Sequence, residues 1–260
     1  MALTSTALTF PFHLNINFSK NSLPNFLYFC DIINLQKKQK SVFTEAFMKK
    51  IITISREYGS GGRLIGKLVA ESLGYDFYDK EIIDMAAQES GLSPDFIKKT
   101  EQNLSSGFLY NLLLGSSYSG TANGASSING TQMLPLADQV FNAERKVILD
   151  LAKKGNCVIV GRCADYILNA SDEVDSKSLL NVFIYGNLEE KLKRIEDLYK
   201  EPEQAAKKTI QQIDKRRANH YNTFTEATWG DRKNYDIMIN SSTAGIEETA
   251  RLISEIAKHQ

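Results

Sequence analysis

Residues 55–67 are Ser-Arg-Glu-Tyr-Gly-Ser-Gly-Gly-Arg-Leu-Ile-Gly-Lys, a glycine-rich turn between two apolar segments. The β-branched run before it, Ile51–Ser55, predicts a buried strand, and apolar residues recur after it at helical spacing over Gly62–Leu73. Glycines between a strand and a helix let backbone N–H groups close around an anion, and the helix N-terminus adds a favourable dipole. The stretch therefore predicts an α/β unit with a phosphate-binding turn.

Apolar runs and helical segments alternate along the rest of the chain. Further strands are expected at Tyr75–Tyr78, Cys157–Val160, Leu179–Tyr185 and Tyr235–Ile239. Helices are expected from the cap Asp79 to Glu89, and at Ser93–Gln102, Leu136–Lys154, Leu188–Tyr199, Glu203–Tyr221 and Ala244–Lys258. This alternation indicates an α/β domain with a mainly parallel sheet.

Composition narrows the class of protein. The chain has 260 residues, 42% hydrophobic and 24% charged, as in ordinary soluble enzymes. Its formal net charge of zero argues against a broad basic surface for nucleic acid. No apolar run in the sequence approaches the ~18 residues of a membrane span. We expect a cytoplasmic protein with small-molecule partners, and the sequence leaves its oligomeric state open.

Cysteine and histidine are sparse. The three cysteines are too few and too irregular for a disulfide framework or a zinc site, and Cys157 is expected to be a buried reduced thiol. The three histidines form neither a triad pattern nor a metal cluster, so hydrolase chemistry is not indicated. We assign no residue to a metal.

Two stretches differ in composition from the rest. Residues 1–47 are rich in Phe and Asn, carry no charge before Lys20 and lack a clear signal-peptide pattern. They are expected to be a poorly ordered extension before a domain at 48–260, with a cleaved export segment as the alternative. Residues 103–134 are dominated by Ser, Gly and Asn, which predicts a flexible insertion, either solvated or part of a flap over substrate.

The glycine-rich turn departs from the usual phosphate loop, Gly-x-x-x-x-Gly-Lys-Ser/Thr. Where that loop has lysine and a hydroxyl residue, the closest alignment places Gly62 and then Arg63 and Leu64. The lysine normally neutralises phosphate charge and the hydroxyl binds Mg²⁺. Arg63 could replace the charge, and Ser60 could supply a hydroxyl from another place. The predicted phosphate-binding residues are Gly59, Ser60, Gly61, Gly62 and Arg63.

Two further arginines follow strands. Arg56 begins the turn, where it either faces the phosphates or pairs locally with Glu57. Gly161-Arg162 follows the strand Cys157–Val160, which would direct a bidentate cation into the same cleft. Asp165 could accept a hydrogen bond from a ribose or base, or cap the following helix.

A charged helix supplies the third group of candidates. Asp214, Arg217 and Tyr221 are three and four residues apart and share one face. Arg216 is adjacent, and Arg194 lies on the preceding helix. A helical lid carrying arginines could neutralise a transferring phosphoryl group, although a solvated helix face is the simpler interpretation.

These motifs, in this order, resemble the cytidylate kinase-like family of phosphate-loop nucleoside monophosphate kinases. The resemblance runs from about Lys49 to the C-terminus, and its most specific part is Ser-Arg-Glu-Tyr-Gly-Ser-Gly-Gly at 55–62. The other matching elements are Tyr75–Lys80, Ile159–Arg162, Asp214–Tyr221, and Trp229-Gly-Asp231 leading to Asn234-Tyr-Asp236.

The resemblance implies a P-loop NTPase-like three-layer sandwich with a five-stranded sheet and a helical lid. It implies transfer of the ATP γ-phosphoryl group to CMP or dCMP, with Mg²⁺ held mostly by phosphates and water. By position, residues 59–63 would hold the donor and Arg162 the acceptor, with an acceptor-binding region at 79–135 and a lid at about 196–220. Arg63, Arg162, Arg194 and Arg217 are then the expected catalytic residues, and Arg56, Arg162, Asp165, Asp214 and Arg216 the substrate-binding ones. A nucleotide-binding or sensing protein without turnover is the alternative.

Overall fold

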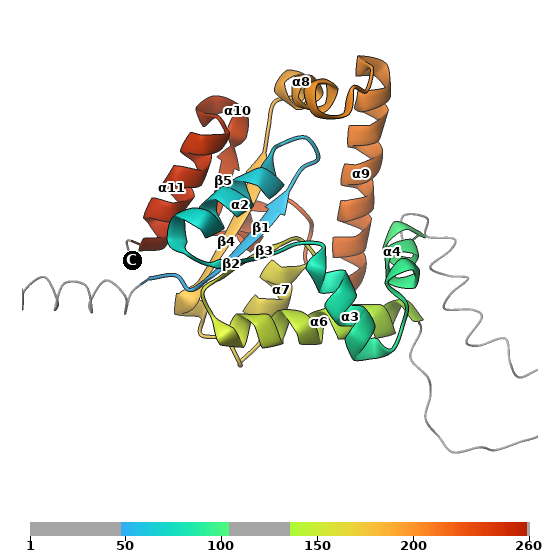
Figure 1. Cartoon of the computed structure of the whole chain (residues 1–260), viewed down its shortest axis with the longest axis vertical. Helices are drawn as coiled ribbons and strands as arrows, with labels where there is room; N and C mark the ends of the chain where they lie inside the picture. Colours follow the sequence, from blue (N-terminus) through green and yellow to red (C-terminus); the bar gives the residue numbers. More distant parts are fainter. Residues whose placement is uncertain (1–47, 104–135, 259–260) are drawn as a thin grey trace, which may run out of the picture. The chain divides into compact units, whose positions relative to one another are not determined.

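The computed structural model describes residues 48–103 and 136–258 (Figure 1). The predicted extension at 1–47 and nearly all of the predicted insertion at 103–134 lie outside the described residues. The part of the acceptor-binding region beyond residue 103 lies outside them as well.

A five-stranded parallel sheet forms the centre of the fold. The strands are ordered β2-β3-β1-β4-β5, and each neighbouring pair is parallel. Their bounds are β1 Ile51–Arg56, β2 Asp76–Tyr78, β3 Cys157–Val160, β4 Leu179–Tyr185 and β5 Ile237–Asn240. The predicted parallel sheet of five strands is confirmed, and its first strand is the central one.

Helices connect the strands and cover the sheet (Figure 1). Their bounds are α2 Gly62–Leu73, α3 Glu81–Ser90, α4 Pro94–Asn103, α6 Leu136–Lys154, α7 Ala164–Asn169, α8 Leu188–Tyr199, α9 Glu203–Phe224, α10 Ser241–Ala244 and α11 Ile246–Lys258, with short 3₁₀ turns at Ser176–Ser178 and Arg232–Asn234. The helix expected at Ala244–Lys258 is divided, because Gly245 has a φ of 82° that an α-helix cannot continue through.

Two apolar cores lie on opposite faces of the sheet. Ile52 and Ile54 of β1 pack with α2 and α11 in one core. Ile51 of the same strand packs in the other, against α3, α6 and α7. The alternation follows from the strand period of two, and burial of both faces explains why the strands are apolar almost throughout. The predicted three-layer sandwich is confirmed.

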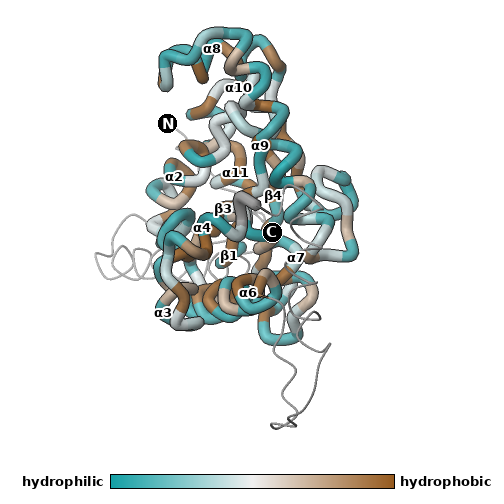
Figure 2. The backbone as a smooth tube through the Cα atoms, turned by 90° about the vertical axis from the view of Figure 1, so that its right-hand side faces the viewer, coloured by the Kyte–Doolittle hydropathy of each residue, from teal (hydrophilic) through white to brown (hydrophobic). Residues whose placement is uncertain are grey.

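Helices α8 and α9 form a smaller unit with its own core. Leu192 and Ile195 of α8 pack against Ala206 and Ile210 of α9, and Tyr58 from the glycine-rich turn packs on them. Figure 1 shows α9 running along one side of the domain with α8 near its upper end. Along both helices hydrophilic positions alternate with hydrophobic ones (Figure 2). Because Tyr58 packs on these two helices, the predicted lid segment lies directly over the turn.

Two smaller expectations concern burial and caps. Cys157 is buried as predicted, and burial raises the pKa of its thiol to about 12. Asp79 is not the predicted helix cap, since Lys80 occupies that position without a side-chain cap bond. The Asp79 carboxylate is paired with two arginines, Arg56 and Arg63. In the described part of the chain, none of the helices is both long and apolar enough to cross a membrane.

Candidate functional site

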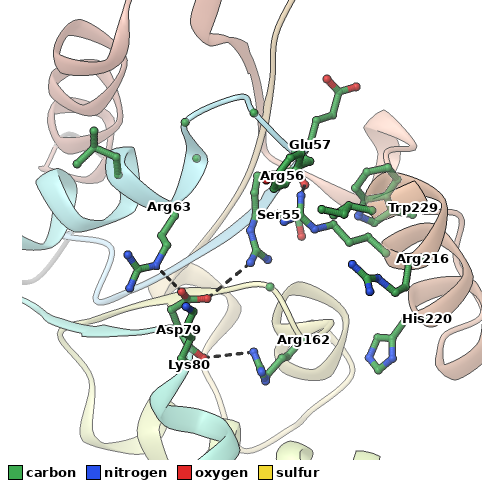
Figure 3. Close-up of a pocket in the computed structure, with 18 of the residues that line it drawn as sticks. Ser55, Arg56, Glu57, Arg63, Asp79, Lys80, Arg162, Arg216, His220 and Trp229 are labelled. Carbon is green, nitrogen blue, oxygen red and sulfur yellow. Dashed lines mark hydrogen bonds and ion pairs between the residues drawn. The ribbon is translucent and has the colours of Figure 1, made fainter. Parts of the chain in front are cut away.

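A cavity of about 920 Å³ opens at the carboxyl ends of β1 and β3 (Figure 3). This is the edge at which open parallel sheets bind ligands. The turn after β1 and the start of α2 line one part of it. Residues of α3, α4, α8 and α9 line the rest, together with Asp79 and Lys80 before α3, residues 161–163 after β3, and Trp229. Nine of the lining side chains are cationic: Arg56, Arg63, Lys67, Lys80, Lys98, Arg162, Arg194, Arg216 and Arg217. Only Glu57 and Asp79 among the described lining residues are acidic, so the cavity suits an anion.

The glycine-rich turn has the backbone of an anion-binding loop. Gly59 and Gly61 both have a φ of 78°, in the left-handed region that favours glycine. Gly61 is the N-cap of α2 and has no side chain that could cap the helix, and Gly62 is the first helical residue. Both line the cavity, so the N-terminus of α2 opens on it. The phosphate-binding prediction for this turn fits that geometry.

Ser60 is placed differently from the expectation. It is fully buried, and its hydroxyl donates to the carbonyl of Glu57 at 2.8 Å. Its own carbonyl accepts a hydrogen bond from the Ser241 hydroxyl at 2.7 Å. Ser60 does not line the cavity, so its side chain stabilises the turn and does not replace the missing hydroxyl ligand.

Asp79 holds two arginines of the turn. Arg63 Nε donates to Asp79 Oδ2 at 2.6 Å, and Arg56 Nη2 lies 3.6 Å from Asp79 Oδ1 (Figure 3). The hydrogen bond to Asp79 raises the pKa of Arg63. Sequence reasoning missed this carboxylate as a site residue, although its position directly after β2 was a usable signal. The pairing fixes where both guanidinium groups lie.

Arg162 lies in the cavity wall as predicted, and a buried carboxylate orients it. Its backbone has a φ of 55°, unusual for a residue with a side chain. Its Nε donates to Oε1 of the fully buried Glu144 at 3.0 Å, and its Nη1 donates to the carbonyl of Asp79 at 3.2 Å. Two partners on different elements therefore define the direction of the guanidinium.

Asp165 lies beneath the cavity and is not among the residues that line it. Its side chain accepts a hydrogen bond from the Tyr221 hydroxyl at 2.8 Å, and the Ser55 hydroxyl is 3.5 Å away. Burial raises the pKa of Asp165 to about 6, although these hydrogen bonds favour its charged form. This geometry supports a structural role, in place of the expected direct contact with a ribose or base.

The predicted face of α9 does point to the rest of the site. Asp214 accepts a hydrogen bond from the backbone N–H of Tyr58 at 2.7 Å. Arg217 Nη1 donates to the carbonyl of Arg56 at 2.9 Å, and its guanidinium lies 5.9 Å from the ring centroid of Tyr58. Burial lowers the pKa of Arg217 and raises that of Asp214. Arg217 lines the cavity, whereas Asp214 anchors the helix to the turn and does not line it.

Two residues of α8 support the turn from above. Arg194, one of the residues predicted to be catalytic, donates to the carbonyl of Gly59. This hydrogen bond places its guanidinium on the turn. Lys191 was missed by sequence reasoning. Its Nζ lies 2.9 Å from Glu57 Oε2 and 3.6 Å from Asp214 Oδ2, with only 7% of the side chain exposed. These pairs fasten α8 and α9 to the same few residues of the turn.

Arg216 also lines the cavity, close to His220 and Trp229 (Figure 3). The aromatic residue was expected only as part of a matching motif. It gives this side of the cavity apolar surface beside the cations. A planar group could therefore be accommodated there.

The described residues do not build a resident Mg²⁺ site. Glu57 and Asp79, the two lining carboxylates, are each paired with cations. The Ser60 hydroxyl is committed to a backbone carbonyl. No group of three or more His, Cys, Asp or Glu in the described part is arranged to hold a metal ion. We therefore assign no side chain as a metal ligand.

Comparison with solved structures finds several matching chains. An uncharacterized protein from Eubacterium ventriosum ATCC 27560 matches with a TM-score of 0.58 and 24% identity over 81% of this chain and 99% of that chain. A shikimate kinase from Bacteroides thetaiotaomicron has a TM-score of 0.41 and 14% identity, over 79% of this chain and 97% of its own. A gluconokinase from Sinorhizobium meliloti 1021 has a TM-score of 0.42 and 14% identity, over 81% and 95%.

No curated protein matches the sequence. The model of the cytidylate kinase-like family, by contrast, matches residues 51–243, which include the turn, Arg162 and the arginines of α8 and α9. The chain belongs to the cytidylate kinase-like family.

Proposed function

We propose that this protein transfers the γ-phosphoryl group of ATP to a nucleoside monophosphate, with CMP or dCMP as the preferred acceptor. The observation that carries the proposal is the cavity itself, where glycines at a helix N-terminus meet arginines from four separate parts of the chain. The choice of a cytidine acceptor rests on membership of the cytidylate kinase-like family.

The donor phosphates are assigned to the turn. Backbone N–H groups at the start of α2 are oriented by the left-handed glycines 59 and 61, and the helix dipole favours negative charge there. Arg63 and Arg194 lie at the two sides of the turn and add charge. This supports triphosphate binding without the usual lysine.

The acceptor phosphate is assigned to Arg162. Its guanidinium is held by Glu144 and by the carbonyl of Asp79, so little reorganisation is needed when an anion binds. Arg216 and Arg217 of α9 face the same cavity and would lie over the transferring group. Lys80 before α3 and Lys98 of α4 line the expected acceptor-binding side.

The chemistry needs no nucleophilic side chain. An anionic oxygen of the acceptor phosphate forms a bond to the γ-phosphorus while the bond to the β–γ bridging oxygen breaks, giving a nucleoside diphosphate and ADP. The protein contributes alignment and neutralisation of the charge on the equatorial oxygens. Each such contact is typically worth about 10²–10³ in rate. Mg²⁺ enters as the ATP complex, held by phosphates and water.

A coupled assay of ADP release with each common nucleoside monophosphate tests the proposal. We expect acceptor-dependent release of ADP, fastest with CMP or dCMP, and a rate about 10²–10³-fold lower from an Arg162→Ala variant that remains folded. Release with other acceptors only would retain the kinase and reject the cytidine preference. Failure of every acceptor, while ATP still raises the melting temperature, would indicate a nucleotide-binding protein without turnover.

A further inference from the structure

Two of the turn's departures from the usual phosphate loop mirror each other, in addition to Arg63 at the position of the hydroxyl residue. In Gly-x-x-x-x-Gly-Lys-Ser/Thr the first residue is glycine and the seventh is lysine. Here the first residue is Arg56 and the seventh is Gly62, with Gly61 retained between them. A cation and a glycine have therefore exchanged places across the loop.

The side chain of Arg56 passes through the space that a lysine at position 62 would need. A Cβ atom built on Gly62 would lie 2.6 Å from Cβ and 3.0 Å from Cγ of Arg56. Gly62 is the first residue of α2 and is not in the left-handed region, so the backbone alone does not demand glycine there. The Arg56 side chain accounts for the absence of a side chain at this position.

A second glycine lies against the other end of the Arg56 side chain, at its guanidinium group. A Cβ atom on Gly161, directly after β3, would lie 2.0 Å from Nη1 and 3.1 Å from Cζ of Arg56. The guanidinium thus lies against the β3 end of the cavity, with Nη2 3.6 Å from Asp79 Oδ1 (Figure 3). Its side chain is 18% exposed, whereas that of Arg63 is 58% exposed. Arg56 is the more enclosed of the two cations that Asp79 orients.

We propose that Arg56 supplies the charge that the loop lysine supplies elsewhere, by contacting the β- and γ-phosphates of the donor from the opposite end of the loop. The role expected for Arg63 thereby passes to Arg56. A guanidinium has five donors, more than one carboxylate can accept, so contact with Asp79 is compatible with phosphate binding. This inference takes its ligand from the proposed function. The steric part of it, that the Arg56 side chain excludes a side chain at position 62, does not depend on that function.

The steric part is tested by a double-mutant cycle that needs no ligand. Gly62→Ala is introduced into the wild type and into an Arg56→Gly background, and the stability of all four proteins is measured by denaturant unfolding. We expect Gly62→Ala to lower the folding equilibrium constant about tenfold with Arg56 present and to leave it nearly unchanged without it. Equal effects in the two backgrounds would overturn the inference.

The ligand part is tested by calorimetric binding of a non-hydrolysable ATP analogue. We expect about 10- to 100-fold weaker binding by Arg56→Gly and at least about tenfold recovery in the exchange variant Arg56→Gly/Gly62→Lys. Arg56→Gln removes the charge while keeping a long polar side chain, and we expect it to bind the analogue as weakly as Arg56→Gly. It replaces Arg56→Gly in the test if the glycine variant fails to fold. Arg251→Ala, at an exposed pair on α11, serves as the control for loss of an arginine.

The outcomes separate the two proposals. If the wild type binds no triphosphate, both the proposed function and this inference fall. If the wild type binds and transfers phosphate but Arg56→Gly and Arg56→Gln bind as well as it does, only the inference falls. The inference falls alone, too, if the exchange variant binds no better than Arg56→Gly.

Discussion

Arg162 in the wall of the cavity is paired with Glu144 in the core. The distance between Arg162 Nε and Glu144 Oε1 is 3.0 Å, and the side chains are 10% and 0% exposed. Glu144 lies on α6, among apolar residues that pack on the sheet. The site therefore depends on a buried carboxylate that does not itself line the cavity.

Removing one partner of this pair should cost more than removing both. We expect Glu144→Ala to lower the free energy of unfolding by about 3–5 kcal/mol, because it leaves the Arg162 charge buried without its main partner. In the double variant Glu144→Leu/Arg162→Met most of that loss should be recovered, while phosphoryl transfer is lost. Denaturant unfolding of both variants checks this. A double variant as unstable as Glu144→Ala would contradict it.

Binding of a triphosphate should weaken with salt. Among the described residues, nine cations and two carboxylates line the cavity, so much of the affinity for an anion is electrostatic and is screened by added ions. We expect the Kd of a non-hydrolysable ATP analogue to rise roughly tenfold between about 0.05 and 0.5 M NaCl. Adenosine, which lacks the phosphates, is the matched control and should change by less than about twofold. Equal salt dependence for both ligands would argue against phosphate recognition by this cavity.

Asp165 should make the fold less stable as the pH rises. Its pKa is raised by burial from 3.8 to about 6, so between these values the folded protein binds a proton that the unfolded chain has released. Its contribution is fully favourable below pH 4 and is lost as the pH rises through 6, a change of roughly 3 kcal/mol.

The variant Asp165→Asn removes this titration. We expect the stability of the variant relative to the wild type to increase by roughly 2–3 kcal/mol between about pH 4 and pH 7, as measured by denaturant unfolding at several pH values. Asp172→Asn, at an exposed carboxylate, is the control and should follow the wild type. A difference between Asp165→Asn and the wild type that does not vary with pH would reject this account.

The sequence was sufficient to predict the sheet and the turn because both have strong local signals. Apolar runs such as Cys157–Val160 have strand length and are bounded by turn residues, and the three glycines at 59, 61 and 62 have few other uses between a strand and a helix. The shared face of Asp214, Arg217 and Tyr221 could be predicted as well, since it depends only on helical spacing.

The partners of those residues could not be predicted as easily. Arg63 meets Asp79 and Arg162 meets Glu144 only because separate elements converge at one edge of the sheet. One signal was present: Glu144 follows Val140 by four residues and precedes Val147 by three, which places it on the buried face of α6. The sequence alone also could not show that the Ser60 hydroxyl binds within the turn or that Asp165 lies beneath the cavity.

Arg217 should not be replaceable by lysine. Its Nη1 donates to the carbonyl of Arg56 at 2.9 Å and lies 3.5 Å from Asp214 Oδ1, while the guanidinium plane is near the Tyr58 ring. A lysine keeps the charge but lacks the planar fork that makes these contacts together. We expect Arg217→Lys to lower kcat/KM for phosphoryl transfer by about 10- to 100-fold, because both the charge over the transferring group and the attachment of α9 to the turn are displaced.

Steady-state kinetics with ATP and the best acceptor measure the effect, and Arg251→Lys on α11 is the matched control for the same exchange at an exposed pair. If Arg217→Lys retains the kinetics of the wild type, α9 contributes only charge, and the geometry of the fork is irrelevant to the reaction.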